Sequence, residues 1–224
     1  MDLKLSIRLN ENLFLRDPET SDLGRRILKN GISLIHKLGF EAFTFKKLGE
    51  EIHTTEASIY RYFENKHRLL LYIITWYWSY LEYQVVFSIN NLTDSEAKIK
   101  RVIDLLTREL DDSLGTLDFD KRALYNIVIS ESSKAYLSKD VDEHNSIQLF
   151  KPYKDLCDRI ALLFNDFNPT YDYPHSLAST VVEAAHFQYF FAQHLPRLTE
   201  VKKDENDFTV KNFLEHLVFA TLSK

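Results

Sequence analysis

The stretch that most constrains the fold of this chain is residues 44–63, which reads TFKKLGEEIHTTEASIYRYF. Its first half carries an apolar stripe at helical spacing, formed by Phe45, Leu48 and Ile52. Thr44 and Thr55 are residues of N-cap type, placed to begin this helix and a second one. The pattern predicts two short helices that cross at a tight turn.

The second short helix has an outward face that is small, polar and singly basic. Ile59 and Phe63 face inward on a wheel of about 3.6 residues per turn, which leaves Ala57, Ser58, Tyr60 and Arg61 outside. Gly49 lies on the inner side of the first helix, where the missing side chain permits a close approach. This is the form of a helix-turn-helix, although periodicity alone fits three packed helices of no particular function equally well.

These residues resemble the DNA-binding domain of TetR-type transcriptional regulators over about residues 23–70. The resemblance is carried by Thr44, Phe45, Leu48, Gly49, Thr55, Ile59, Tyr60, Phe63, Lys66, Leu69 and Leu70. The chain departs from the family at the turn, where His53 stands in place of glycine and Thr54 in place of an aliphatic residue. Because histidine tolerates positive φ better than β-branched residues do, we expect His53 to be left-handed.

Composition favours an all-α chain with about nine helices. Only five glycines and five prolines interrupt long apolar-periodic runs, and 45% hydrophobic with 27% charged residues is ordinary for a globular protein. We expect an N-terminal extension at 1–19, a three-helix helix-turn-helix domain at 20–66, and a larger helical ligand-binding and dimerisation domain at 67–224.

The N-terminal extension alternates between apolar and polar residues around Asn10-Glu11-Asn12. Alternation around a polar tripeptide predicts a short β-strand or hairpin. A frayed arm is the alternative.

The net charge of −5 is unevenly distributed. Residues 21–70 carry nine Lys/Arg against six Asp/Glu, a surplus of +3, while residues 71–224 carry 16 against 23, or −7. A local basic surplus suits phosphate contacts, and a solvated surface is the ordinary alternative.

A helix expected from Lys66 to about Phe87 is aromatic on most of its circumference, so it should be covered on several sides. Another is expected from about Glu143 to Phe164, and at Pro152 it either kinks or gives way to a second helix. Aromatic side chains at such spacing are usually core. As candidates for a ligand pocket we name Trp76, Tyr80, Tyr125, Phe150, Tyr153 and Phe187.

The last two expected helices, 174–194 and 206–222, are too apolar to remain uncovered in a monomer. In TetR-like proteins the last two long helices pair with their two-fold mates, so the resemblance implies a homodimer. The expected interface residues are Val181, Ala185, Phe190, Phe213 and Leu217.

On DNA, the two recognition helices of a dimer would meet successive major grooves about 34 Å apart, so the operator should be palindromic. We assign base-edge contacts to Ala57, Ser58 and Arg61, and phosphate contacts to Thr44, Thr55, Tyr60 and Lys66. The phosphate role of Lys66 is implied by the resemblance. Tyr62 could pack in the protein core or contact the DNA backbone. Glu56 could accept a hydrogen bond from a cytosine or stabilise the N-terminus of its own helix.

Catalysis is the competing class, and the sequence offers little for it. The eight histidines show no metal-ligand spacing, and no glycine-rich phosphate loop is present. We expect no enzymatic activity, no cofactor and no metal, with His186 and His194 as core or interface residues. Cys157 is the one cysteine and fits a reducing cytoplasm, where the absence of a signal peptide or apolar span also places the chain.

The sequence therefore predicts a dimeric, cytoplasmic transcriptional regulator, most simply a repressor. The resemblance implies an effector that is a small, largely apolar molecule bound by the C-terminal domain. The alternative is a ligand-binding or protein-interaction module that kept this fold with weak or lost DNA binding.

Overall fold

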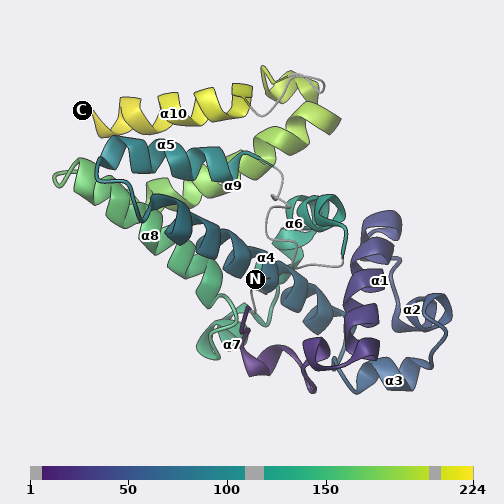
Figure 1. Cartoon of the computed structure of the whole chain (residues 1–224). Helices are drawn as coiled ribbons and strands as arrows, with labels where there is room; N and C mark the ends of the chain where they lie inside the picture. The colour runs from purple at the N-terminus through teal and green to yellow at the C-terminus, as the bar shows by residue number, and fades with distance from the viewer. Residues whose placement is uncertain (1–6, 109–118, 202–207, 224) are drawn as a thin grey trace. The chain divides into compact units, whose positions relative to one another are not determined.

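The computed structural model describes residues 7–108, 119–201 and 208–223. Within them the chain is all-helical and forms ten α-helices with three short 3-10 turns (Figure 1). The α-helices are α1 Asp22–Leu38, α2 Phe45–Glu51, α3 Glu56–Tyr60, α4 Lys66–Ile89, α5 Ser95–Leu106, α6 Lys121–Tyr136, α7 Val141–Ser146, α8 Lys151–Phe167, α9 Pro174–His194 and α10 Phe208–Leu222. The all-α expectation is confirmed.

The chain divides into two compact units. Unit 1 comprises residues 1–79 and 109–151, and unit 2 comprises residues 80–108 and 152–224. The helix-turn-helix expected at 20–66 falls within unit 1, which also takes in α6, α7 and the first half of α4.

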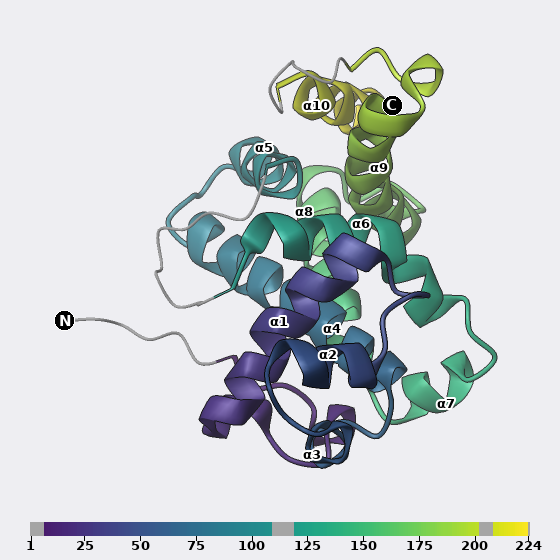
Figure 2. The ribbon, with the colours of Figure 1, turned by 90° about the vertical axis from the view of Figure 1, so that its right-hand side faces the viewer.

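In unit 1, α1 packs against α2, α6 and the 3-10 turn η2 (Pro18–Thr20), and α2 packs against α3 (Figure 2). The side chain of Ser21 begins α1 by accepting from the Gly24 N–H, and Gly39 ends it with φ 76°. The first part of α4 is the centre of this unit, because residues 69–78 are all buried. The expectation that this aromatic helix is covered on several sides is confirmed.

The N-terminal extension is not a strand or hairpin in residues 7–19, and residues 1–6 lie outside the described part. Two 3-10 turns stand there, η1 (Glu11–Leu13) and η2. The Asn10 side chain accepts from the Asn12 N–H at 2.9 Å, and Asp17 accepts from the Glu19 N–H at 2.9 Å. Local capping of this kind competes with a strand ladder, so the apolar alternation was misleading.

The region around Pro152 contains two helices instead of one kinked helix, which adds one to the expected nine. After α7, Gln148 takes φ 63°, and the Leu149 N–H donates to the His144 carbonyl at 3.0 Å. This left-handed end is a Schellman motif. Pro152 then lies in the first turn of α8, where its missing N–H costs no helical hydrogen bond.

In unit 2, α10 lies alongside both α5 and α9 (Figure 1). Asp104 of α5 accepts from the Lys211 ammonium of α10 at 3.0 Å and pairs with Arg108 at 2.7 Å. Arg159 of α8 pairs with Glu82 of α4 at 2.6 Å. The Lys211–Asp104 and Arg159–Glu82 pairs therefore link α10 to α5 and α8 to α4 within unit 2.

Candidate nucleic-acid interface

The two helices of the helix-turn-helix begin at the expected threonines. Thr44 accepts from the Lys47 N–H and Thr55 accepts from the Ser58 N–H, each at 3.2 Å. Each hydroxyl satisfies one of the N–H groups that a helix start leaves free. The ring of Tyr60 packs edge-on against Phe45 with centroids 5.0 Å apart, which holds α3 against α2.

The turn between α2 and α3 is a Schellman motif with His53 in its left-handed position. The Thr54 N–H donates to the Gly49 carbonyl at 2.8 Å, and the His53 N–H donates to the Glu50 carbonyl at 3.4 Å. His53 has φ 52°, so the expected left-handed conformation is confirmed. A residue with a Cβ pays roughly 1–2 kcal/mol for this conformation, which glycine would avoid.

Gly49 allows this turn to close tightly. A Cβ added at Gly49 would lie 2.9 Å from the Thr54 carbonyl oxygen and 3.4 Å from the Glu56 nitrogen. Both neighbours are backbone atoms, which do not move aside as a flexible side chain does. Alanine at position 49 would therefore not fit this turn without a shift of the backbone.

The outward face of α3 is available to a partner. Glu56, Ala57, Tyr60 and Arg61 are exposed, and Ser58 is half-buried with its hydroxyl 2.8 Å from that of Thr55. The side chain of Arg61 forms no hydrogen bond or ion pair with any described residue, so its guanidinium is open to solvent. An exposed, unengaged arginine beside small side chains can approach the edge of a base.

Lys66 does not have a free ammonium, which corrects its assignment to phosphate. Its Nζ donates to the carbonyls of Phe40, Glu41 and Phe43 at 2.9, 3.1 and 3.2 Å. An ammonium has three N–H donors, so all of them are used within the protein. The Nζ also lies 4.7 Å from the centroid of the Phe40 ring. Lys66 holds the loop between α1 and α2 in place.

Tyr62 belongs to the core and not to the outward face of α3. It is 2% exposed, and its hydroxyl lies 2.7 Å from that of Ser21. Of the two roles left open by the sequence, the structure selects the first.

The loop that Lys66 supports is also held by α6, which sequence reasoning missed. Glu131 accepts from the Phe40 N–H at 3.2 Å, and Lys134 pairs with Glu131 at 2.8 Å and with Glu41 at 2.9 Å. The hydrogen bond from Lys134 holds the pKa of the Glu41 carboxyl below its usual range. No local pattern links residues 40 and 131, so only the fold reveals these contacts between α6 and the loop.

Two histidines pack where α7 meets the start of α4. The rings of His67 and His144 stack with centroids 5.8 Å apart. Burial lowers the pKa of both, and the neighbouring Arg68 lowers it further. The pair is therefore held in the neutral form, as a packing element of unit 1.

The six candidate pocket residues are divided between the two units. Trp76, Tyr125 and Phe150 are buried in unit 1, whereas Tyr80, Tyr153 and Phe187 belong to unit 2. Phe187 is 49% exposed, so it lines no interior cavity. Beside Trp76 there is a void of only about 10 Å³, which is at the lower limit for one water molecule.

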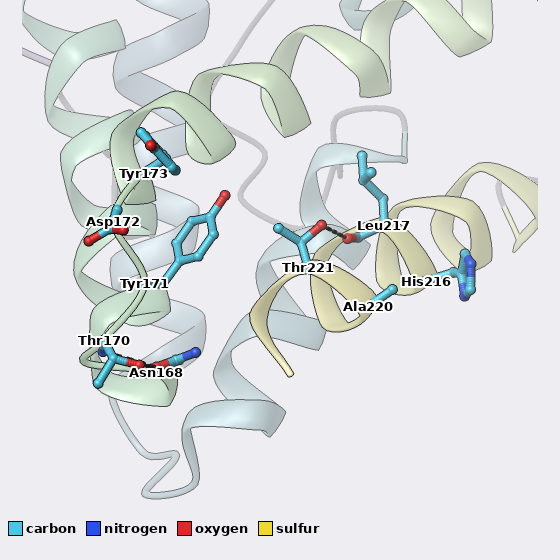
Figure 3. Close-up of a pocket in the computed structure, with 9 residues that line it drawn as sticks. All are labelled: Asn168, Thr170, Tyr171, Asp172, Tyr173, His216, Leu217, Ala220 and Thr221. Carbon is cyan, nitrogen blue, oxygen red and sulfur yellow. Dashed lines mark hydrogen bonds between the residues drawn. The ribbon is translucent and has the colours of Figure 1, made fainter. Parts of the chain in front are cut away.

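A larger hollow in unit 2 lies between the α8–α9 loop and α10 (Figure 3). Its volume is about 500 Å³, and it is lined by Asn168, Thr170, Tyr171, Asp172, Tyr173, His216, Leu217, Ala220 and Thr221. Leu217, expected at the dimer interface, is the only residue it shares with our predictions. The hollow opens onto the surface of α10.

The expected dimer residues fall into two groups. Val181 and Ala185 are 0% and 1% exposed within the single chain, so they offer no surface to a second copy. Phe190 and Leu217 are half-buried, and Phe213 is 43% exposed. The apolar surface of α9 and α10 is therefore aromatic and narrower than the sequence indicated.

No cluster of three or more potential metal ligands occurs among the described residues. Burial holds the pKa of His186 at about 4 and raises that of the Cys157 thiol to about 12. Both side chains are therefore neutral, and the thiol is unreactive at neutral pH. None of the described helices is long and apolar enough to span a membrane.

Residues 27–73 match the model of a family described as bacterial regulatory proteins, tetR family. This match covers α2, α3 and the parts of α1 and α4 that pack on them. The family is one of regulatory proteins and not of enzymes. No curated protein sequence matches the chain.

Several solved structures share the fold at low sequence identity. The complex of AibR with isovaleryl coenzyme A and operator DNA is 15% identical, with a TM-score of 0.62 over 88% of this chain and 99% of that one. The fatty acid degradation regulator FadR from Bacillus halodurans is 14% identical, with a TM-score of 0.60 over 86% and 92%.

The superantigen PfiT is 13% identical, with a TM-score of 0.60 over 92% of this chain and 98% of that one. These likenesses concern the fold alone. The resemblance read from the sequence is confirmed over residues 27–73, where this chain matches the model of the tetR family of bacterial regulatory proteins.

Proposed function

We propose that this chain is a DNA-binding transcriptional repressor that acts as a homodimer on a palindromic operator in the cytoplasm. The observation that carries the proposal is the outward face of α3. It presents Ala57, Ser58 and an unengaged Arg61 on a helix fixed by the Thr55 cap and the His53 turn.

Each of these side chains suits a base edge in the major groove. The guanidinium of Arg61 can donate two hydrogen bonds to O6 and N7 of a guanine. The methyl group of Ala57 suits a thymine methyl, and the hydroxyl of Ser58 both donates and accepts. Thr44, Thr55 and Tyr60 are the proposed phosphate contacts, because their exposed side chains flank the same face.

One such face is small, so the proposal requires two copies. The exposed aromatic side chains of α9 and α10, Phe187 and Phe213, are the surface that a second copy would cover. A two-fold dimer would then present two recognition helices to successive major grooves on one face of the duplex.

The effector is proposed to be a small, largely apolar molecule. The AibR structure contains isovaleryl coenzyme A, and another neighbour is named as a regulator of fatty acid degradation, which makes acyl compounds the first class to test. Such a molecule releases DNA only if it binds the DNA-free arrangement of the dimer more tightly than the bound one.

The test is a selection of duplexes from a randomised pool, followed by fluorescence anisotropy with the selected duplex and a scrambled duplex of equal composition. The proposal expects a palindromic consensus, tighter binding to it than to the scrambled duplex, and binding that weakens as salt rises. A pool that shows no enriched sequence would overturn it.

A protein-interaction module with weak or lost DNA binding is the second candidate. It is supported by the superantigen PfiT, whose name is not that of a DNA-binding regulator. The surplus of acidic residues after residue 70 also favours it. This candidate expects weak binding to DNA with no preference between the selected and scrambled duplexes.

A further inference from the structure

The segment from Asn10 to Ser21 contacts Tyr62, which lies two residues after the end of α3. The Leu15 N–H donates to the Tyr62 carbonyl at 2.8 Å. The guanidinium of Arg16 lies 5.3 Å from the centroid of the Tyr62 ring, and the hydroxyl of Ser21 lies 2.7 Å from that of Tyr62. Backbone, ring and hydroxyl of one residue are therefore all held by this segment.

Tyr62 directly follows Arg61, the residue that the proposed function assigns to a base edge. Helix α3 has only five residues, Glu56–Tyr60, so it cannot maintain its own conformation without external contacts. Its C-terminal carbonyls also lack helical partners. The Leu15 N–H supplies a partner for the carbonyl just after the helix, where a small rotation would redirect Arg61.

The segment is itself anchored by contacts with other parts of unit 1. Leu13 is 0% exposed, and the Asn10 side-chain amide donates to the Ile147 carbonyl at 2.8 Å, just after α7. The ring of Phe14 packs edge-on against Tyr72 of α4 with centroids 6.1 Å apart. The same Tyr72 ring lies 5.5 Å from that of Phe63, so segment and recognition helix share one support.

We propose that residues 10–21 are a positioning element of the DNA-binding surface, which fixes the orientation of Arg61 through Tyr62. The inference rests on the proposed function, since it assigns how the same surface is aligned. Without the segment, a smaller fraction of molecules would hold α3 in the competent orientation, and apparent affinity for the specific duplex would fall by that fraction. Non-specific binding would not change, because phosphate contacts tolerate such rotation.

The matched pair Leu15→Pro and Leu15→Ala tests the backbone contact. Proline removes the N–H donor, while alanine retains it, and the Leu15 side chain is 67% exposed, so its loss alone costs little. Phe14 has φ −145° and ψ 157°, the extended conformation that a residue before proline prefers. Tyr62→Phe is a second, milder variant that removes only the hydroxyl contact with Ser21.

We expect Leu15→Pro to bind the selected duplex about tenfold more weakly than Leu15→Ala, the effect of losing one ordinary hydrogen bond. We expect Tyr62→Phe to bind it about threefold more weakly than the unmodified chain. Binding of all variants to the scrambled duplex should agree within about twofold, and thermal melting should confirm that each is folded. Equal specific binding of Leu15→Pro and Leu15→Ala would overturn the inference. If Leu15→Pro does not fold, Tyr62→Phe decides in the same way.

Hydrogen exchange of the DNA-free protein separates this inference from the proposed function. The amides of residues 61–63 should exchange about tenfold faster in Leu15→Pro than in Leu15→Ala, whether or not any duplex is selected. Unchanged exchange there would contradict the positioning role. If exchange is faster but no sequence is enriched from the DNA pool, the segment does hold α3 in place. In that case it is the proposed DNA-binding function that is refuted.

Discussion

The outer face of α3 and the exposed side of α9 and α10 are two surfaces of opposite chemical character. The first is small and polar, with Ala57 and Ser58 on a five-residue helix and Arg61 directly after it. Caps, a Schellman turn and the N-terminal segment hold this region in place. The second is aromatic, with Phe187 and Phe213 on two long helices that pack on each other. The difference indicates different partners: the polar face suits a nucleic acid, and the apolar face suits protein.

The two surfaces also differ in what stabilises them. Recognition at α3 depends on orientation, so residues that touch no partner matter as much as those that do. Association through α9 and α10 depends on apolar area removed from water, so the exposed side chains themselves carry it.

The largest effect is expected from Phe213→Glu. A carboxylate in a buried interface would weaken dimerisation by more than about a hundredfold, because the charge must be desolvated without a partner. Light scattering at micromolar concentration should report a monomer, and the selected duplex should no longer be bound. Leu137→Glu is the matched control, since Leu137 is 87% exposed in unit 1. A Phe213→Glu protein that remains dimeric would refute the assignment of this surface.

Acidification should lower the stability of unit 2 through His186, a buried residue of α9. Burial holds its pKa near 4, whereas in the unfolded chain it is about 6.5. The unfolded state therefore binds more protons below about pH 6.5, and the free energy of unfolding falls as pH drops from there toward 4.

Urea unfolding should lose about 2 kcal/mol between pH 7 and pH 5 from this group. His186→Leu should remove that part of the loss, while the same change at the exposed His216 should not. The same pH dependence in both variants would show that His186 is not responsible.

Arg61→Ala acts on the polar face alone. Loss of a bidentate contact to guanine should weaken binding to the selected duplex by about 1–3 kcal/mol for each half-site. Binding to scrambled duplex should weaken only slightly, and dimerisation should not change. Arg61→Lys keeps the charge and should still lose most of the discrimination. If anisotropy titrations show that Arg61→Ala prefers the selected duplex over the scrambled duplex as strongly as the parent does, Arg61 does not read a base.

Lys66→Met tests whether Lys66 supports the loop between α1 and α2 instead of contacting a DNA phosphate. Because Lys66 donates to three carbonyls, we expect the variant to lose about 2 kcal/mol of stability in unit 1. The slope of log affinity against log salt should stay the same, since no phosphate contact is removed. Lys46→Met, at an exposed position on α2, is the control for charge. A slope reduced by about one with full stability would restore the phosphate role.

The smallest effect is expected from His53→Gly. Glycine adopts φ 52° without the cost that a Cβ brings, so stability should rise by about 1 kcal/mol. Denaturant unfolding of the variant and parent measures this difference. His36→Gly, in the last turn of α1, should instead destabilise the protein by up to about 1 kcal/mol, because glycine has a low helix propensity. The two His→Gly variants should therefore change the free energy of unfolding in opposite directions. A destabilised His53→Gly would show that the histidine side chain contributes to the turn.

The sequence was most informative where the determinants are local. The caps at Thr44 and Thr55, the left-handed His53 and the close approach at Gly49 all depend on residues within one turn of each other. Such features leave a pattern that a single sequence reveals.

Sequence reasoning failed where a side chain had a distant partner. The ammonium of Lys66 reaches carbonyls about 25 positions earlier, and Glu131 reaches Phe40 across 91 positions. The N-terminal segment was expected as strand or arm because its apolar alternation was visible, while its contact with Tyr62 was not. Likewise, periodicity marked Val181 and Ala185 as apolar without showing that their own chain already covers them.

The central claim, that a symmetric pair of small polar faces reads DNA, is tested most directly by stoichiometry on DNA. Mass photometry or sedimentation should be run with the selected palindrome and with a duplex that retains only one half-site. We expect two chains on the palindrome, bound far more tightly than on the half-site duplex. A single chain bound with equal affinity to both duplexes, or no stable complex with either, would contradict it.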